Sequence, residues 1–251
     1  MPEPVLLKLG GSVLTRKGGP GTVRHENLAM ISREIAGHAR VPLLIVHGAG
    51  SCGHPEADRF RLMEGLTGQN LEGVFTTHLA VSKLNSIVVT SLRKEGIEAI
   101  GLHPLDSCYA ENGRIVSMEC RHIREMLSQG IVPVLHGDVV MDGIKGATIV
   151  SGDQIVSYLG RALRFGRIGL ATDVPGVLAG NTVIPVLTPQ TIGQVRIGSS
   201  RYTDVTGGME GKIRELLELA RSGTCSEIFH VDQTGAFLDG RPHGGTVVRG
   251  G

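Results

Sequence analysis

Short apolar runs along the chain alternate with longer segments in which apolar residues recur every three or four positions. The short runs, rich in Val, Ile and Leu, predict β-strands over 5–9, 42–46, 98–102, 132–135, 167–171 and 227–231. The longer segments predict helices over 26–39, 71–95, 119–129, 154–163 and 209–221. This alternation favours βαβ units, and therefore an α/β fold with a mostly parallel sheet that is buried on both faces.

Two segments interrupt the alternation. At 113–117 and 141–148, Gly and charged residues separate brief apolar stretches, a pattern that predicts short hairpins inserted between the larger units. Such hairpins are candidates for lids. Because the chain shows no internal repeat and no long linker, we expect one domain over 1–251.

The charge balance and the absence of long apolar runs restrict the possible partners. Lys and Arg total 25 against 24 Asp and Glu, and aromatic residues make up only 3%, so no nucleic-acid partner is expected. The sequence contains no apolar run of the roughly 20 residues needed to span a bilayer. Its first residues show no basic segment followed by an apolar stretch, so no signal peptide is expected. The four cysteines form no C-x-x-C pair and are typical of reduced thiols. These features predict a cytoplasmic protein with small-molecule partners and no membrane contact.

Glycine is abundant, and it gathers in loops that follow predicted strands. The segments are "KLGGS" at 8–12, "HGAGSCGH" at 47–54 and "GDVV" at 137–140. Loops after parallel strands meet at the carboxyl edge of the sheet, where exposed backbone N–H groups can bind phosphate. Any one of them could instead be a tight turn. Since neither a dinucleotide-binding fingerprint nor a P-loop follows the first strand, a phosphate site here must be of another design.

Three later motifs carry further polar groups. Ser151, Gly152 and Asp153 precede an amphipathic helix, where plain N-capping is the alternative to a functional role. Asp173 in "ATDVPGV" directly follows a strand, where it could merely form a turn. In "DVTGGMEGKIREL", Lys212 lies in the first turn of a helix, a position that the helix dipole disfavours unless the lysine faces a polyanion.

Taken together, the motifs "KLGGS…TRK", "VHGAGSCGH", "KLNS", "GDVV", "SGDQ", "TDVPGV" and "DVTGGMEGKIRELLELA" resemble the amino acid kinase superfamily. Within it, the chain most closely resembles the archaeal-type isopentenyl phosphate kinases. The resemblance covers nearly the whole chain. It implies a three-layer αβα sandwich whose N-terminal part binds the acceptor and whose C-terminal part binds ATP.

The resemblance also implies residue roles. The implied ATP-binding residues are Lys8, Leu9, Gly10, Gly11, Ser12, Gly50, Asp173, Gly208 and Lys212. The implied substrate-binding residues are Ala49, Gly50, Gly53, His54 and Gly152. The implied catalytic residues are Lys8, Lys17, His54 and Asp153. Among these, Lys17 would stabilise transition-state charge, His54 would bind the acceptor phosphate and Asp153 would hold the lysines in place.

The implied reaction is ATP-dependent phosphorylation of isopentenyl phosphate to isopentenyl diphosphate in isoprenoid biosynthesis, with Mg²⁺ on the donor phosphates and no metal held by the protein alone. Phosphoryl transfer depends mainly on alignment and charge neutralisation. A phosphate monoester is largely a dianion at neutral pH, because its second pKa is near ~6, so no general base is required. His54 is therefore expected to bind the acceptor, the alternative being a structural loop histidine. The resemblance implies a homodimer.

The sequence departs from the family in one loop, where Cys52 replaces the usual Phe and leaves the shape of the isoprenoid pocket open. The helix over 71–95 is expected to line that pocket. On it, Val74, Phe75, His78 and Leu79 share a face, although core packing would explain the same pattern.

Two other functions remain open on the sequence. One is a kinase for a different small oxyanion on the same fold, such as a fosfomycin-like phosphonate or the carboxylate of N-acetylglutamate. The other is a nucleotide-binding protein that has lost catalysis, which the presence of both N-terminal lysines and His54 disfavours.

Overall fold

A computed structural model describes residues 3–16, 21–192 and 208–251. In the described ranges an eight-stranded sheet has the order β12-β14-β13-β9-β1-β2-β6-β3. Its strands are β1 (Val5–Leu9), β2 (Leu43–His47), β3 (Ala99–Gly101), β6 (Val132–His136), β9 (Arg167–Thr172), β12 (Val186–Leu187), β13 (Ser226–His230) and β14 (Thr246–Val248). The pairs from β13 to β3 are all parallel, whereas β14 runs antiparallel to β13.

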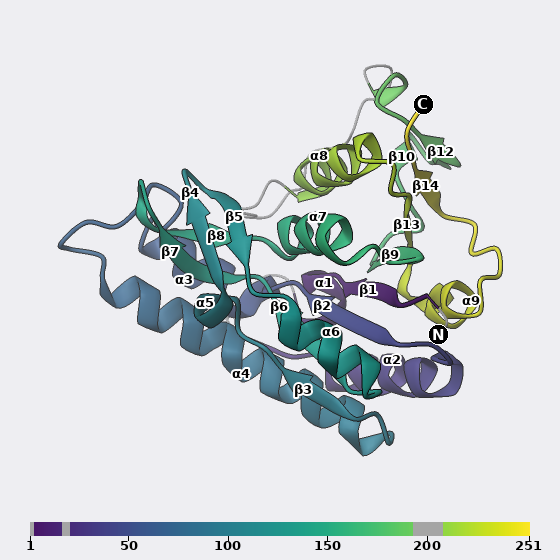
Figure 1. Cartoon of the computed structure of the whole chain (residues 1–251), viewed down its shortest axis with the longest axis horizontal. Helices are drawn as coiled ribbons and strands as arrows, with labels where there is room; N and C mark the ends of the chain where they lie inside the picture. The colour runs from purple at the N-terminus through teal and green to yellow at the C-terminus, as the bar shows by residue number, and fades with distance from the viewer. Residues whose placement is uncertain (1–2, 17–20, 193–207) are drawn as a thin grey trace.

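Helices cover both faces of this sheet (Figure 1). On one face lie α2 (His25–His38), α4 (Glu72–Lys94) and α9 (Thr234–Leu238); on the other lie α6 (Arg121–Ser128), α7 (Gly152–Leu163) and α8 (Gly208–Arg221). The predicted αβα sandwich with a mostly parallel sheet is confirmed, and all the predicted strands and helices are present close to their expected bounds. No helix within the described ranges is both long enough and apolar enough to cross a membrane.

The strand period of two divides β1 between the two faces. Val5, Leu7 and Leu9 pack with α2, α4 and α9 in one apolar cluster, whereas Leu6 belongs to the cluster under α6, α7 and α8. Burying each such aliphatic side chain contributes roughly 1.5–3 kcal/mol. The same alternation places the amino group of Lys8 on the α7 face of the sheet, where it pairs with a residue of that helix.

A smaller sheet has the order β5-β4-β7-β8 and is built from β4 (Cys108–Glu111), β5 (Arg114–Met118), β7 (Asp138–Asp142) and β8 (Gly146–Val150). The turn between β7 and β8, at 143–145, lies within the predicted segment 141–148, whereas the turn between β4 and β5 lies at 112–113 and most of the predicted segment 113–117 is β5 itself. Parallel pairing of β4 with β7 joins both hairpins. One prediction is wrong here. "GDVV" is not a loop, because residues 138–140 pair with β8 as part of β7. A third, two-stranded sheet pairs β10 (Leu178–Ala179) with β11 (Thr182–Val183).

Candidate active site

The loops that follow β1 and β2 interlock at the carboxyl edge of the large sheet. The N–H of Gly48 donates to the carbonyl of Leu9, with the two atoms 3.0 Å apart. A Cβ on Gly11 would lie 2.5 Å from the amide nitrogen of Gly50, and one on Gly48 would lie 2.7 Å from that of Gly11. Only glycine allows two backbones to approach this closely. The predicted convergence of these two glycine loops is therefore present.

Beside them, two lysines share one buried carboxylate. Lys8, near the end of β1, places Nζ 2.7 Å from Oδ1 of Asp153, and Nζ of Lys212 lies 3.2 Å from the same oxygen. Asp153 lies in the first turn of α7, whose N-cap Ser151 accepts a hydrogen bond from the N–H of Gln154. Lys212 comes from near the start of α8. Three elements far apart in the sequence thus bring their polar groups to one point.

Burial and charge shift the ionisation of this cluster. Burial lowers the pKa of the Lys8 amine to about 8, in spite of the opposing charge of Asp153. Burial alone would raise the pKa of Asp153, but the charges of Lys212 and Lys8 outweigh it and lower that pKa to about 2. At neutral pH the Asp153 carboxylate is therefore ionised, and most Lys8 amines carry their positive charge.

The loop after β2 leads into short helices. A 3₁₀ turn, η1 (Gly50–Cys52), is followed by α3 (His54–Arg59), so His54 is half-buried at the first position of a helix. Gly53 precedes it, and a Cβ there would lie 2.4 Å from Val81 of α4. This explains why glycine stands at that position. Ala49 is buried, and its N–H has no hydrogen-bond acceptor in the described part of the protein.

The remaining predicted residues lie around these loops. Ser12 is half-buried in α1 (Gly11–Leu14), and Gly10 donates its N–H to the carbonyl of Ala171 at the end of β9. Gly152 is close-packed, because a Cβ there would lie 3.1 Å from Cε of Lys8. The side chain of Leu9 is fully buried in the core on the α2 face, so only its backbone faces the loops.

Two predicted ATP-binding residues lie at the ends of elements, and one predicted catalytic residue lies outside the described residues. Asp173 is exposed directly after β9, and Gly208 begins α8 with a φ of 56°. Lys17 lies outside the described residues.

The face of α4 next to the loops carries both exposed and packed apolar side chains and one hydrogen-bonded histidine. Phe75 and Leu79 are 61% and 37% exposed, so core packing does not explain these two positions. Val74 packs against a small apolar cluster that includes residues of β7 and β8. His78 donates from Nδ1 to the buried carboxylate of Asp138, at 3.0 Å from Oδ2, and this hydrogen bond raises the pKa of the imidazole.

Cys52, which stands where the family usually has Phe, is buried in the apolar cluster on the α2 and α4 face of the sheet. Burial raises the pKa of its thiol. The side chain therefore contributes to packing beneath the loop.

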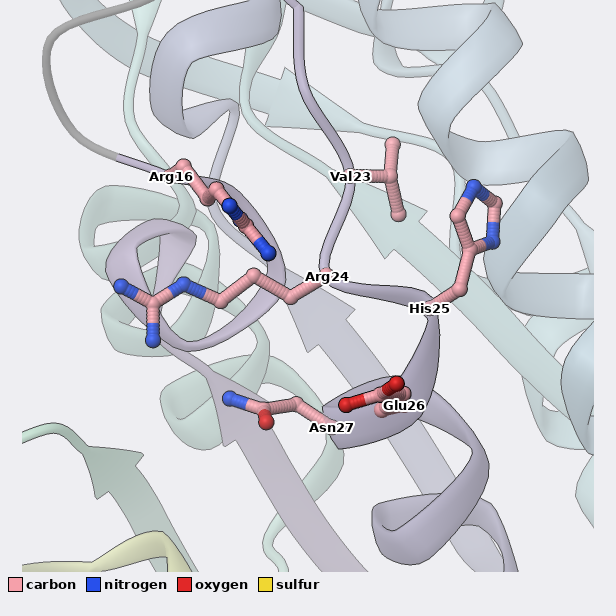
Figure 2. A pocket seen from close by; sticks show the side chains of 6 residues that line it. All are labelled: Arg16, Val23, Arg24, His25, Glu26 and Asn27. Atoms are coloured by element: carbon pink, nitrogen blue, oxygen red, sulfur yellow. The ribbon is translucent and has the colours of Figure 1, made fainter.

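A pocket of about 580 Å³ adjoins the same end of the protein. Figure 2 shows its lining residues, which are Arg16, Val23, Arg24, His25, Glu26 and Asn27. Thr15 and Val23 form an isolated antiparallel bridge, so the pocket lies between this bridge and the start of α2. None of its lining residues belongs to the predicted site.

Backbone donors and lysine charge at the carboxyl edge of a parallel sheet are the means by which many α/β proteins hold phosphate groups. Fold and geometry together place the chain in that broad class. The sequence model of the amino acid kinase family matches residues 3–229, and the chain belongs to this family.

Individual relatives are also similar over nearly the full length. The chain is 40% identical over 248 residues to the isopentenyl phosphate kinase of Haloferax volcanii, covering 98% of each. It is 40% identical over 245 residues to the isopentenyl phosphate kinase of Methanothermobacter thermautotrophicus, covering 90% of each. A crystal structure of an isopentenyl phosphate kinase superposes with a TM-score of 0.84 at 36% identity, covering 97% of this chain and 99% of the other.

Four polar residues near the loops escaped the sequence analysis. They are His47, Asn85, His103 and His136. The only signals that could have found them were the first histidine of "HGAGSCGH" and the asparagine of "KLNS", neither of which indicates a chemistry by itself.

Proposed function

We propose that this protein transfers the γ-phosphoryl group of ATP to isopentenyl phosphate and forms isopentenyl diphosphate and ADP. The observation that carries the proposal is the pair of lysines on one buried carboxylate beside two interlocked glycine loops. The isopentenyl phosphate kinases described above, 40% identical to this chain, support the choice of acceptor.

In the proposed reaction, an oxygen of the acceptor phosphate forms a bond to the γ-phosphorus. The bond from that phosphorus to the β,γ-bridging oxygen breaks, and its electron pair leaves with ADP. Lys8 and Lys212 stabilise the charge on the transferring group, and Asp153 holds both amines at one point. We assign Lys17 to the same task.

The remaining predicted residues bind the two substrates. Backbone N–H groups of the loops after β1 and β2 donate to phosphate oxygens, and the absence of side chains at Gly11 and Gly50 leaves the backbone accessible. His54 donates to the acceptor phosphate. No general base is required, because the acceptor dianion already presents a nucleophilic oxygen.

We propose Mg²⁺ as the accompanying metal. Among the described residues, no group of three or more His, Cys, Asp or Glu side chains could hold a metal ion. In kinases, Mg²⁺ is usually bound mainly through nucleotide phosphates. When bound, it neutralises charge on the donor phosphates.

The proposal extends to a cytoplasmic homodimer. Cys52, Cys108, Cys120 and Cys225 are free thiols, which suits a reducing compartment. Exposed apolar side chains offer surface for a second copy. They are Leu71 at the N-cap of α4, Phe75 on α4, and Ile100 on the edge strand β3. Light scattering coupled to size-exclusion chromatography measures this state directly.

A substrate panel tests the proposed activity. Initial rates with ATP and Mg²⁺ are compared for isopentenyl phosphate, dimethylallyl phosphate, longer isoprenyl phosphates, fosfomycin and N-acetylglutamate. We expect kcat/KM to be highest among the isoprenyl phosphates and far lower for the last two. A clear preference for fosfomycin or N-acetylglutamate would identify the protein as another kinase of the same fold. Absence of turnover with every acceptor would favour a binding protein.

A further inference from the structure

Two histidines end neighbouring strands directly beneath the glycine loops. His47 closes β2 and His136 closes β6, and they are register partners in the sheet. Both side chains are fully buried, and their rings stack with centroids 5.5 Å apart. The proposed reaction uses neither of them, so their place at the site needs another explanation.

The partners of His47 define its tautomer. Its Nδ1 lies 3.1 Å from the carbonyl oxygen of Gly48, which can only accept, so Nδ1 carries the proton. Its Nε2 then accepts from Nδ2 of Asn85 on α4, at 3.1 Å. The same Nδ2 donates to the carbonyl of Val134, 3.0 Å away, which fixes the orientation of the amide. Burial lowers the pKa of His47 to about 4, so the ring is neutral at physiological pH.

The packing around Asn85 leaves this arrangement little freedom. The side chain is fully buried, and a Cβ on Gly101 would lie 2.2 Å from its Oδ1. Asn85 therefore fits only because glycine stands at 101. The asparagine of "KLNS" accordingly holds the imidazole of His47 from the side opposite to the loop.

The hydrogen bond of His47 orients the next peptide group. In a trans peptide the C=O and the N–H point in opposite directions. The carbonyl of Gly48 points to the imidazole, which lies on the α4 face of the sheet. The N–H of Ala49 must therefore point toward the other face. On that face lie Lys8 and Gly152, with a Cβ at Gly152 only 3.1 Å from Cε of Lys8.

We propose that His47 is a positioning residue for phosphoryl transfer. Its Nδ1–H holds the Gly48–Ala49 peptide in the orientation that directs the N–H of Ala49 at the acceptor phosphate, and Asn85 secures the tautomer that makes this possible. That N–H has no acceptor in the described part of the protein, as a donor reserved for substrate requires. The inference rests on the proposed function for the identity of the acceptor.

His136 repeats the arrangement one strand further along. Its Nδ1 lies 3.1 Å from the carbonyl oxygen of Gly137, and its Nε2 accepts from Nδ1 of His103 at 2.8 Å. The same ring nitrogen thus binds the carbonyl that follows each strand. The repetition indicates that these imidazoles share a common task in shaping the backbone at the carboxyl edge.

Two variants of His47 separate a positioning role from mere packing. In His47→Asn the amide nitrogen takes the place of Nδ1 and can still donate to Gly48. In His47→Gln the amide reaches the place of Nε2 and can still bond to Asn85, but the donor to Gly48 is lost. For His47→Gln we expect kcat/KM for isopentenyl phosphate to fall about 10²-fold, the loss associated with a small misplacement of a reacting group. The KM for ATP should not change.

His47→Asn should retain most of the acceptor kcat/KM. Both variants lose one buried hydrogen bond and part of the ring volume, so their melting temperatures should fall by similar amounts. Equal kinetic losses in the two variants would show that packing alone matters and would overturn the inference. Unchanged acceptor kinetics in His47→Gln would overturn it as well.

Nuclear magnetic resonance on the unmodified protein tests the inference even if a variant does not fold. Two-bond couplings in ¹⁵N-labelled protein should show His47 as the neutral Nδ1–H tautomer, and an Nε2–H tautomer would refute the positioning role. With ¹⁵N-alanine labelling, the Ala49 amide should shift on addition of inorganic phosphate, and no shift would equally refute it. If the protein does not turn over isopentenyl phosphate, the proposed function fails, while these two resonances still decide the role of His47.

Discussion

At the scale of single residues, the buried lysine of β1 makes activity depend on pH. Burial lowers the pKa of Lys8 to about 8, so above that pH the unliganded protein loses a positive charge that binds and stabilises phosphate. With the acceptor well below saturation, the apparent kcat/KM for ATP should therefore fall as the pH rises through about 8. Rates measured from about pH 7 to pH 10 check this, since kcat/KM reports the free protein.

At saturating ATP, the decrease of kcat with rising pH should occur at a higher pH, because the bound polyanion favours the charged form of the Lys8 amine. Lys8→Arg provides a control whose charge does not titrate in this range. A kcat/KM for ATP that stays constant to about pH 9.5 would contradict the shifted pKa, because an ordinary lysine titrates near 10.4.

His54 allows donation to be distinguished from proton abstraction. If it donates to the acceptor phosphate from the first position of α3, His54→Gln should keep part of the activity, since an amide can donate from a similar place. His54→Ala should lose more. A general base would behave differently, because neither side chain accepts a proton at neutral pH. The measurement is kcat and KM for isopentenyl phosphate at saturating ATP.

Circular dichroism melting of both His54 variants serves as the folding control. Near-complete and equal loss in both would exclude the donor role, and wild-type kinetics in both would make His54 a structural loop histidine.

Sequence motifs anticipated the charged residues of the site better than the neutral ones that support it. The charged residues lie near the ends of predicted strands and helices, where the sequence shows a charge beside an apolar run. They are Lys8, Asp153 and Lys212. His47 and Asn85 gave no such signal. Their pairing depends on the register of β2 and on the face that α4 turns inward, which are non-local properties.

At the scale of elements, the interlocked loops after β1 and β2 should tolerate no side chain. In Gly48→Ala, the new Cβ would lie 2.7 Å from the amide nitrogen of Gly11, and that neighbour is backbone, which cannot move aside cheaply. We expect a loss of stability of about 1–3 kcal/mol and a larger proportional loss of kcat/KM for both substrates. Urea unfolding and steady-state kinetics measure the two effects.

Gly37→Ala is the matched control. Gly37 lies in α2, and a Cβ there would meet nothing within 4 Å. This substitution should therefore leave kinetics unchanged and raise stability by about 0.4–1 kcal/mol. If Gly48→Ala behaved like Gly37→Ala, close approach of the two loops would not be needed for activity.

The elements themselves were predictable wherever hydrophobic periodicity is strong and local. β7 shows the limit of this method. Gly137 followed by Asp138 suggests a loop, yet the following residues form a strand because β8 supplies hydrogen-bond partners from farther along the chain. The short strands β12 and β14 escaped prediction for a similar reason, since pairing with each other and with β13 defines them.

At the scale of the whole molecule, the central position of β1 joins the two halves of the chain. β1 pairs with β2 on one side and with β9 on the other, an order that periodicity cannot reveal. The cluster under α7 and α8 combines Leu6 and Leu44 from the N-terminal part with Ile213 and Ile228 from the C-terminal part. The part proposed to bind the acceptor and the part proposed to bind ATP therefore share one core.

A shared core predicts one cooperative unfolding transition for the entire chain. Separating the halves would expose both edges of the β1–β9 pair and the apolar cluster beneath it, so neither half should melt alone. Scanning calorimetry should give a calorimetric enthalpy equal to the van't Hoff enthalpy. Binding of ATP with Mg²⁺ at about 100 times its Kd should add ~2.7 kcal/mol and move the whole transition upward by roughly 5–10 °C. Two transitions, of which ATP moves only one, would instead reveal two independently folding lobes and contradict the single domain.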